Sequence, residues 1–251
     1  NDPFLVQYGN WLLGVVQGDM GISYSAKKPV MEKLMEGFAG TVLLALTTII
    51  LIIIISIPLG IFSATHRNRI PDFLVRIFSF IGVSMPSFWV GLILLYIFGL
   101  KLGLVPIATA KVSFSGLILP ALTLAIYQSA KYTRQVRTVI LDELHQDYVI
   151  GARARGLSEK VILWKHILPN AILPLITLLG MSIGWLLGGV AVIETVFSWP
   201  GIGKMAVQAI TMRDYPLIEG IVLWIATVYT VINFLVDLSY SYLDPRIKKE
   251  N

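Results

Sequence analysis

Cysteine is absent from this chain of 251 residues, and charged residues make up only 14% of it. The absence of cysteine excludes a disulfide framework, thiolate chemistry and any metal site built from thiolates. The scarcity of charge excludes an ordinary soluble domain, because the surface of such a domain needs more ionisable side chains. Apolar residues reach 56% instead. In such a chain, a formal net charge of +5 is no evidence for nucleic acid as a partner.

Long stretches without charge account for the apolar composition. Lys, Arg, Asp and Glu are missing from five runs, which are residues 37–65, 77–100, 112–130, 167–193 and 220–236. Each of the first four is long enough to cross roughly 30 Å of hydrocarbon at about 1.5 Å of helix rise per residue. Residues 238–243 extend the fifth run to the interface. The sequence therefore predicts an all-α, polytopic membrane protein with five spans.

The distribution of basic residues predicts the orientation of these spans. Five spans place the chain ends on opposite sides, and the side richer in Lys and Arg faces the cytoplasm. One side holds seven basic residues: Lys27, Lys28, Lys33, Lys101, Lys111, Lys204 and Arg213. The other side holds thirteen: Arg67, Arg69, Arg76, Lys131, Arg134, Arg137, Arg153, Arg155, Lys160, Lys165, Arg246, Lys248 and Lys249.

This count makes the C-terminus cytoplasmic and residues 1–36 an extracytoplasmic segment. That segment combines an uncharged helix lying at the outer interface, a turn at Gly18–Gly21, and a short amphipathic helix that begins at Pro29. Because the chain begins outside and lacks an initiating Met, we also expect the full-length protein to have a further span before Asn1.

The second predicted span carries a helix breaker. Pro86 leaves a backbone carbonyl without its usual N–H donor, and the hydroxyls of Ser84 and Ser87 can hydrogen-bond to it. The break either lines a cavity of the transport pathway or is a plain kink. We therefore take Ser84 and Pro86 as candidate pathway residues, with both interpretations open.

The fourth and fifth spans supply the other candidates for the pathway or its gates. Gly184 belongs to a ridge with Gly180 and Gly188 that favours close helix packing more strongly than a gate. Glu194 follows the outer end of the fourth span, where we expect it at the interface. Asp237 lies near the cytoplasmic end of the fifth, where we expect it to pair with a basic residue or a helix end rather than relay protons.

The segment from Asp147 to Pro169 is the only long charged, helix-forming stretch, and it lies between the third and fourth spans. Leu144, Tyr148 and Ala152 recur every four residues and form one apolar stripe on a short helix. Gly156 ends that helix, because glycine takes the left-handed C-terminal conformation at little cost.

A second short helix follows this glycine. Ser158 is a good N-cap for it, Glu159 lies at its positive end, and Val161, Ile162 and Trp164 supply its apolar face. The sequence thus predicts a helix, a glycine corner and a second helix lying across the cytoplasmic surface. Small residues at positions 151, 152 and 154 leave room for a soluble partner. A simple interfacial loop would need neither the corner nor this length.

This segment resembles the cytoplasmic EAA loop of permease subunits in ATP-binding-cassette importers. The loop pattern is Glu-Ala-Ala, three residues, Gly, nine residues and Ile-x-Leu-Pro. Ala152, Gly156 and Leu168-Pro169 fit the pattern, whereas Ile150-Gly151 replace Glu-Ala and His166 replaces Ile.

One branch of these permeases has loops that read Asp-Tyr-Val-x-x-Ala-Arg-Ala-x-Gly-Leu, as residues 147–157 do here. It is the oligopeptide/dipeptide/nickel permease family. The likeness covers nearly the whole chain and includes residues 18–23, 84–89, 194–201, 213–216 and 244–246. It implies a type I importer transmembrane-domain fold over residues 37–251 of this chain, six spans in the full-length protein, and a coupling loop at about residues 138–168.

The resemblance also implies partners and roles in the cytoplasmic membrane of a bacterium or archaeon. They are a second homologous permease, two P-loop ATPases that bind ATP and Mg, an extracytoplasmic solute-binding protein and the lipid bilayer, but no nucleic acid. The residues implied to couple to the ATPases are Asp147, Tyr148, Ala152, Arg153, Ala154, Gly156, Leu157 and Ser158. We expect no catalytic, metal-binding or cofactor-binding residue, because the chain has no phosphate-binding Gly-x-x-x-x-Gly-Lys-Ser/Thr loop.

Peptides are the substrates that the resemblance favours, and nickel or a nickel chelate is the alternative. The three His residues make no spaced metal site, but nickel can travel as a chelate. An ion-coupled secondary carrier would need ionisable residues deep in the spans, and four of the five runs have none. An intramembrane hydrolase would need a paired nucleophile and base or a metal motif, and neither is visible in the spans.

Overall fold

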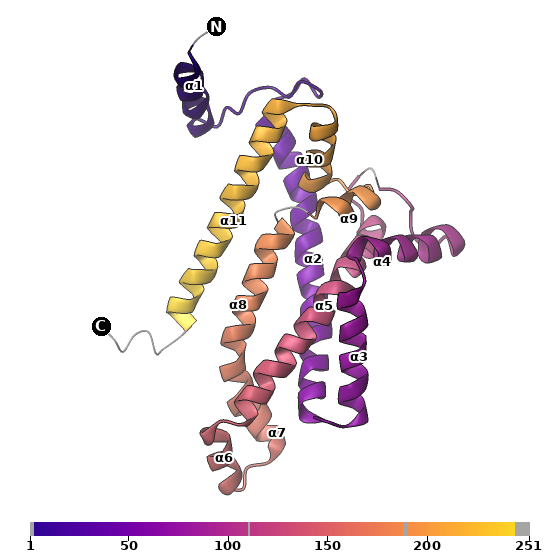
Figure 1. Ribbon diagram of the computed structural model, residues 1–251, viewed down its shortest axis with the longest axis vertical. Helices are drawn as coiled ribbons and strands as arrows, with labels where there is room; N and C mark the ends of the chain where they lie inside the picture. Colours follow the sequence, from indigo (N-terminus) through magenta and orange to yellow (C-terminus); the bar gives the residue numbers. More distant parts are fainter. Residues whose placement is uncertain (1–2, 110, 188–189, 244–251) are drawn as a thin grey trace. The chain divides into compact units, whose positions relative to one another are not determined.

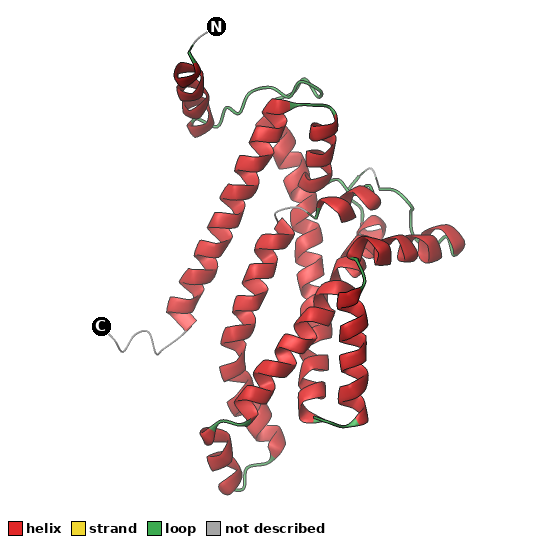
Figure 2. Cartoon of the chain, viewed as in Figure 1, coloured by secondary structure: helices red, strands yellow, loops and turns green. Residues whose placement is uncertain are grey.

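The computed structural model describes residues 3–109, 111–187 and 190–243. Over this range its regular structure is helical (Figure 2), apart from one isolated bridge between Ile22 and Pro29. The elements, labelled in Figure 1, are α1 (Phe4–Val16), α2 (Val30–Thr65), α3 (Ile70–Ser84), α4 (Ser87–Leu94), η1 (Leu95–Lys101), α5 (Phe114–Leu144), α6 (Asp147–Ala154), α7 (Glu159–Ile162), η2 (Leu163–Ile167), α8 (Leu168–Leu187), α9 (Ala191–Val196), α10 (Ile202–Thr211) and α11 (Tyr215–Leu243). The all-α prediction is confirmed.

Three helical stretches of the described chain are long and apolar enough to cross a membrane: Val30–Thr65, Glu159–Leu187 and Tyr215–Leu238. They correspond to the first, fourth and fifth predicted spans. The amphipathic helix expected after Pro29 is not a separate element, because α2 runs without interruption from Val30 into the span. Pro169 does not separate the coupling segment from the fourth span either, since α7, η2 and α8 follow one another directly.

The second predicted span is not one straight helix. α3 and the stretch Ser87–Lys101 are bent by 98° at the break before Pro86. Met85 has an extended backbone with ψ 132°, which is the conformation that a following proline imposes on its neighbour. The Ser84 hydroxyl donates to the Phe80 carbonyl oxygen at 2.8 Å, one turn back in α3. The predicted break at Pro86 is therefore present, and residues 70–101 form either one broken span or a re-entrant loop.

The third predicted span is helix α5, which continues well past Ala130 as expected. α5 is long, but it is less apolar than the three stretches that meet the criteria for a span. Its polar residues lower its mean hydropathy. Four of them, Thr123, Gln128, Ser129 and Thr133, are buried in the protein. A helix that is covered by protein needs fewer apolar residues than one that faces lipid.

The chain divides into two compact units, each with its own apolar core. The first unit comprises the described parts of Asn1–Ala45, Leu94–Pro120 and Gly184–Val231, and the second comprises those of Leu46–Ile93, Ala121–Ile183 and Ile232–Asn251. The buried core of the first unit joins α2, α10 and α11 through Val30, Leu34, Ile202, Ala209, Leu217 and Ile221. The buried core of the second joins α2, α5, α6, α7, η2 and α8 through Ala64, Val136, Ile140, Val149, Ala152, Ile162, Ile167, Ala171 and Leu175.

A buried carboxylate holds the α2–α3 turn of the second unit against α5. Asp72 is fully buried and accepts hydrogen bonds from the Arg137 guanidinium at 2.7 and 2.9 Å. The Ser63 hydroxyl and the Asn68 N–H also donate to it. A charge in such a place needs this many partners, because removing a carboxylate from water without them is strongly unfavourable. We did not anticipate this pair from the sequence.

Candidate functional site

The glycine corner between α6 and α7 has the predicted geometry. Gly156 has φ +77°, and it follows the last turn of α6. The Gly156 N–H donates to the Arg153 carbonyl at 2.9 Å, and the Leu157 N–H donates to the Ala152 carbonyl at 3.2 Å. These two bonds form a Schellman motif, which satisfies the last carbonyls of a helix and requires the left-handed conformation at the glycine. In Figure 1, α6 and α7 flank this corner.

The start of α7 differs in detail from the prediction. Ser158 occupies the N-cap position, but its side chain makes no capping hydrogen bond. Glu159 instead pairs across the corner with Arg153, through Nε–Oε1 and Nη2–Oε2 contacts of 2.7 and 3.1 Å. The two short helices are therefore joined by a bidentate ion pair as well as by the backbone.

The inner face of the corner packs into the core of the second unit. Val149 and Ala152 are completely buried there, and the predicted stripe is confirmed, because Leu144 and Tyr148 pack against the same cluster. The Tyr148 hydroxyl donates to Glu143 Oε2, and burial together with this bond raises the pKa of Tyr148. The burial of Ala152 corrects its assignment as a surface for a partner: it holds α6 in place.

The outer face of the corner is open to a partner. Asp147, Arg153, Ala154, Leu157 and Ser158 are exposed, as a docking surface requires. Sequence reasoning missed a large exposed apolar residue of α6, Ile150, whose exposed fraction is 58%. Trp164 was expected on the buried face of the second helix, but it too is 58% exposed, and Ile162 is the residue that is buried.

A second candidate site lies in the first unit, where Glu194 of α9 is fully buried rather than at an interface. Its carboxylate accepts a hydrogen bond from the Thr41 hydroxyl at 2.8 Å and another from the Lys204 N–H at 2.9 Å. Thr41 Oγ1 in turn accepts from the Ile202 N–H at 2.9 Å. Glu194 and Thr41 thus satisfy N–H groups in the first turn of α10, which have no partners within their own helix.

The chain between α9 and α10 is locked onto α2 next to this carboxylate. Trp199 is completely buried, and its Nε1–H donates to the Gly40 carbonyl oxygen at 2.9 Å. A Cβ at Gly40 would collide with the Pro200 carbonyl oxygen, and a Cβ at Gly201 would collide with the carboxyl group of Glu194. Gly40 therefore allows the backbone of α2 to approach that of Pro200, and Gly201 allows the Glu194 carboxylate to reach the start of α10. The α9–α10 segment is therefore a rigid clamp on α2.

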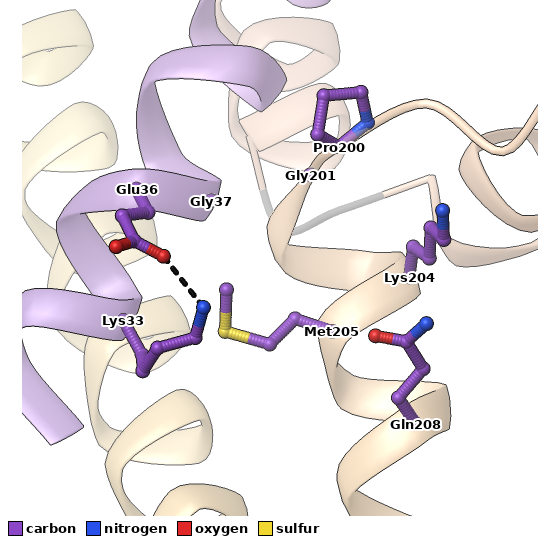
Figure 3. Close-up of a pocket in the computed structure, with 8 residues that line it drawn as sticks. All are labelled: Lys33, Glu36, Gly37, Pro200, Gly201, Lys204, Met205 and Gln208. Atoms are coloured by element: carbon purple, nitrogen blue, oxygen red, sulfur yellow. Dashed lines mark hydrogen bonds and ion pairs between the residues drawn. The ribbon is translucent and has the colours of Figure 1, made fainter. Parts of the chain in front are cut away.

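A hollow of about 270 Å³ lies next to the clamp (Figure 3). Its lining includes Lys33, Glu36 and Gly37 of α2, and Lys204, Met205 and Gln208 of α10, together with Pro200 and Gly201. Lys33 donates to Glu36 at 2.5 Å, and the Lys204 ammonium donates to the Ser198 carbonyl oxygen at 2.9 Å. The charged groups of the hollow thus already have hydrogen-bond partners, and we assign it no ligand.

Asp214, between α10 and α11, is a buried carboxylate that the sequence analysis did not single out. It accepts from the Ser23 hydroxyl at 2.6 Å, from the Ser25 hydroxyl at 2.7 Å, and from the N–H groups of Tyr24 and Ser25. Burial alone would raise the pKa of Asp214, but these hydrogen bonds hold it well below its usual range. Two of the motifs quoted separately for the family resemblance, at residues 18–23 and 213–216, therefore meet in space.

Of the two remaining candidates, Gly184 has a structural explanation and Asp237 does not. A Cβ at Gly184 would be 3.1 Å from the Tyr229 ring, and one at Gly180 would collide with Val236, so both glycines allow α11 to approach α8. This confirms the packing interpretation, although Gly188 lies outside the described residues. Asp237 is exposed and forms no ion pair with any residue that the structure describes, so its expected pairing is not observed.

Comparison with solved structures identifies the fold. The chain resembles a methionine ABC transporter, MetNI, solved in inward-facing conformations, with a TM-score of 0.70 and 18% identity over 85% of this chain and 97% of that chain. An amino acid ABC transporter matches with a TM-score of 0.61 and 18% identity, over 82% and 92% of the two chains. The fold is that of the transmembrane subunit of an ABC importer, as predicted.

Sequence comparison then gives the family. Residues 56–249 match the family described as "Binding-protein-dependent transport system inner membrane component", and the chain belongs to it. It is 42% identical to the oligopeptide transport system permease protein AppB of Bacillus subtilis, over 99% of this chain and 82% of that protein. It is 38% identical to the dipeptide permease DppB of Alkalihalophilus pseudofirmus, over 99% and 83%. The glutathione permease GsiC of Salmonella typhimurium is also 38% identical, over 99% and 81%.

Proposed function

We propose that this permease subunit forms half of the translocation pathway of an ATP-driven importer for dipeptides and oligopeptides. The glycine corner at residues 147–162 docks on a cytoplasmic P-loop ATPase, and a second homologous permease forms the other half of the pathway. An extracytoplasmic binding protein delivers the solute. ATP and Mg bind in the ATPases and not in this chain. The corner then faces the cytoplasm, and residues 1–36 face outward.

One observation carries the coupling role: the inner face of the corner is packed into the core of the second unit, and its outer face is exposed. Val149, Ala152 and Ile162 anchor it in the same core as α5 and α8, so a displacement of the corner is passed to the helices that follow. On the other side, Ile150 and Leu157 are exposed apolar residues within a charged surface, which is typical of a protein interface. A loop that only joined two spans would need neither feature.

The movement follows from this rigidity. When ATP closes the ATPase dimer, the docked corners of the two permeases are drawn together. Because each corner is packed against its own α5 and α8, these helices move with it, and the pathway opens outward to receive solute. The Schellman turn and the Arg153–Glu159 pair keep α6 and α7 at a fixed angle during the movement.

The relatives support peptides as the solutes. Their names assign them to dipeptide, oligopeptide and glutathione transport, and all three solutes are short peptides. Nickel, free or chelated, is the alternative that the broader family resemblance leaves open. An uptake assay with a labelled dipeptide and with nickel separates the two.

Arg153 provides a test of docking. Reversing its charge (R153E) should weaken association with the ATPase roughly tenfold, about 1.4 kcal/mol. The reason is that a carboxylate then replaces the exposed guanidinium that faces the partner. Co-purification of the ATPase with the tagged permease gives the measurement. Unchanged recovery would remove Arg153 from the interface.

The swapped pair R153E/E159R is the matched control. It restores an ion pair across the corner but leaves the charges at positions 153 and 159 exchanged. If Arg153 contacts the ATPase, the swap should not restore association. Full restoration by the swap would mean that Arg153 acts only by holding α6 against α7.

A further inference from the structure

Helix α5 carries three basic residues just beyond its apolar part, and the structure separates them into two kinds. Arg137 is neutralised by the buried carboxylate of Asp72, at 2.7 Å. Lys131 and Arg134 are exposed, and neither has a carboxylate within ion-pair distance in the described parts of the chain. The charge of Arg137 thus has a partner within this chain, whereas the charges of Lys131 and Arg134 have none among the described residues.

Lys131 and Arg134 line a hollow of about 490 Å³, which we call the α5 groove. Gln135, Thr138 and Val139 of α5 and Leu178 of α8 complete its lining. The Gln135 side-chain oxygen is buried and has no hydrogen-bond donor among the described residues. Within the described chain, the groove therefore places two cations that have no carboxylate partner beside an acceptor oxygen that has no donor, which suits an anion that also carries hydroxyl groups.

The depth of the groove in the membrane identifies the source of that anion. Lys131 is the first charged residue after the run 112–130, so it lies where the predicted third span leaves the hydrocarbon. With the proposed orientation, this is the cytoplasmic interface. Basic pockets between membrane helices at that level bind the headgroups of anionic lipids.

We propose that the α5 groove binds one anionic phospholipid, whose phosphate contacts Lys131 and Arg134. The Gln135 side-chain oxygen can accept a hydrogen bond from a headgroup hydroxyl, and Thr138, whose own hydroxyl donates to the Arg134 carbonyl oxygen at 3.0 Å, lines the groove beside it. This inference rests on the membrane orientation in the proposed function, but not on the solute or on ATP. A bound lipid would brace α5 against α8, the two helices that flank the coupling corner.

Phosphatidylglycerol is the probe, and the full-length protein purified in a neutral detergent is the sample. Native mass spectrometry counts the bound lipid at increasing lipid concentration. Each removed cation should weaken binding about fivefold, so the variant K131Q/R134Q should bind roughly 25-fold more weakly than the wild type. The variant R69Q/K165Q removes the same charge from exposed positions outside the groove, and it should retain wild-type binding.

Several outcomes would overturn the proposal. One is unchanged lipid binding in K131Q/R134Q, and another is an equal loss of lipid binding in both double variants. A third is displacement of the lipid by inorganic phosphate, which would make the groove a site for free phosphate. Displacement of the lipid by a dipeptide would assign the groove to the solute. If K131Q/R134Q does not fold, K131R/R134K keeps the charge and should bind within about twofold of the wild type; a 25-fold loss there would refute the proposal.

These measurements need neither ATPase nor solute, so their failure is distinct from a failure of the proposed transport function. A protein that binds the lipid but imports no peptide would leave the groove assignment intact. A protein that imports peptide normally but binds no lipid at Lys131 and Arg134 would refute the groove alone.

Discussion

Replacing Gly156 with valine is expected to reduce ATP-driven uptake about tenfold or more, while the protein still inserts in the membrane at normal levels. Gly156 has φ +77°, a conformation that costs an L-residue roughly 1–2 kcal/mol and a β-branched one more. The Schellman turn would then open, and α6 and α7 would lose their fixed angle. Core packing at Val149 and Ala152 is untouched, which is why insertion should survive. Uptake in proteoliposomes and membrane abundance are the two measurements.

Two further variants separate backbone geometry from side-chain bulk. A Cβ at either Gly151 or Gly156 meets no heavy atom of the described chain within 4 Å, so neither position is limited by space. Gly151 lies in α6 without a positive φ, so G151V is free of backbone strain and reports only on added bulk at the surface where small residues leave room for the partner. Asparagine tolerates the left-handed region better than other residues, so G156N should retain more uptake than G156V. Equal uptake in G156V and the wild type would contradict the coupling role of the corner.

The second large effect is expected at Glu194. Its replacement by alanine leaves the Thr41 hydroxyl and the Lys204 N–H buried without an acceptor, at a cost of about 2–4 kcal/mol in total. The α9–α10 clamp should then loosen from α2. Thermal unfolding of the purified protein should show a lower Tm, and uptake should fall with it.

Two control variants test whether the loss of stability in E194A comes from the lost hydrogen bonds. E194Q keeps one acceptor oxygen and should lose less stability than E194A. E219A removes an exposed carboxylate from α11 in the same unit and should leave the Tm unchanged. If E194A has a normal Tm but uptake is lost, Glu194 acts in the pathway and not in the clamp. If both are normal, the hydrogen bonds around Glu194 do not hold the clamp.

Features encoded by neighbouring residues could be predicted from the sequence. The glycine corner follows from the backbone preference of Gly156 and the spacing of Leu144, Tyr148 and Ala152, and both are present in the structure. The break at Pro86 was also predictable in position, because proline restricts only itself and the residue before it. Its angle of 98° was not, since that depends on what α3 and α4 pack against.

Features that depend on distant partners were missed. Glu194 accepts from Thr41 across 153 positions, Asp214 from Ser23 across 191, and Asp72 from Arg137 across 65. The sequence presents each carboxylate next to an apolar run, where an interfacial position is the simplest expectation. Only the fold brings the donors to them. Ala152 was misassigned for the same reason, because a small residue on a short helix serves equally well for a partner or for the chain's own core.

The central claim is that ATPases drive this permease through the corner at residues 147–162. The direct test is to purify the full-length protein from its native membrane in a gentle detergent, to identify its partners by mass spectrometry, and to reconstitute the recovered complex for uptake of a labelled dipeptide. The account predicts recovery of P-loop ATPases and a second permease, and uptake that requires ATP. Recovery of the chain alone, with transport that proceeds without ATP, would contradict it and would favour an ion-coupled carrier.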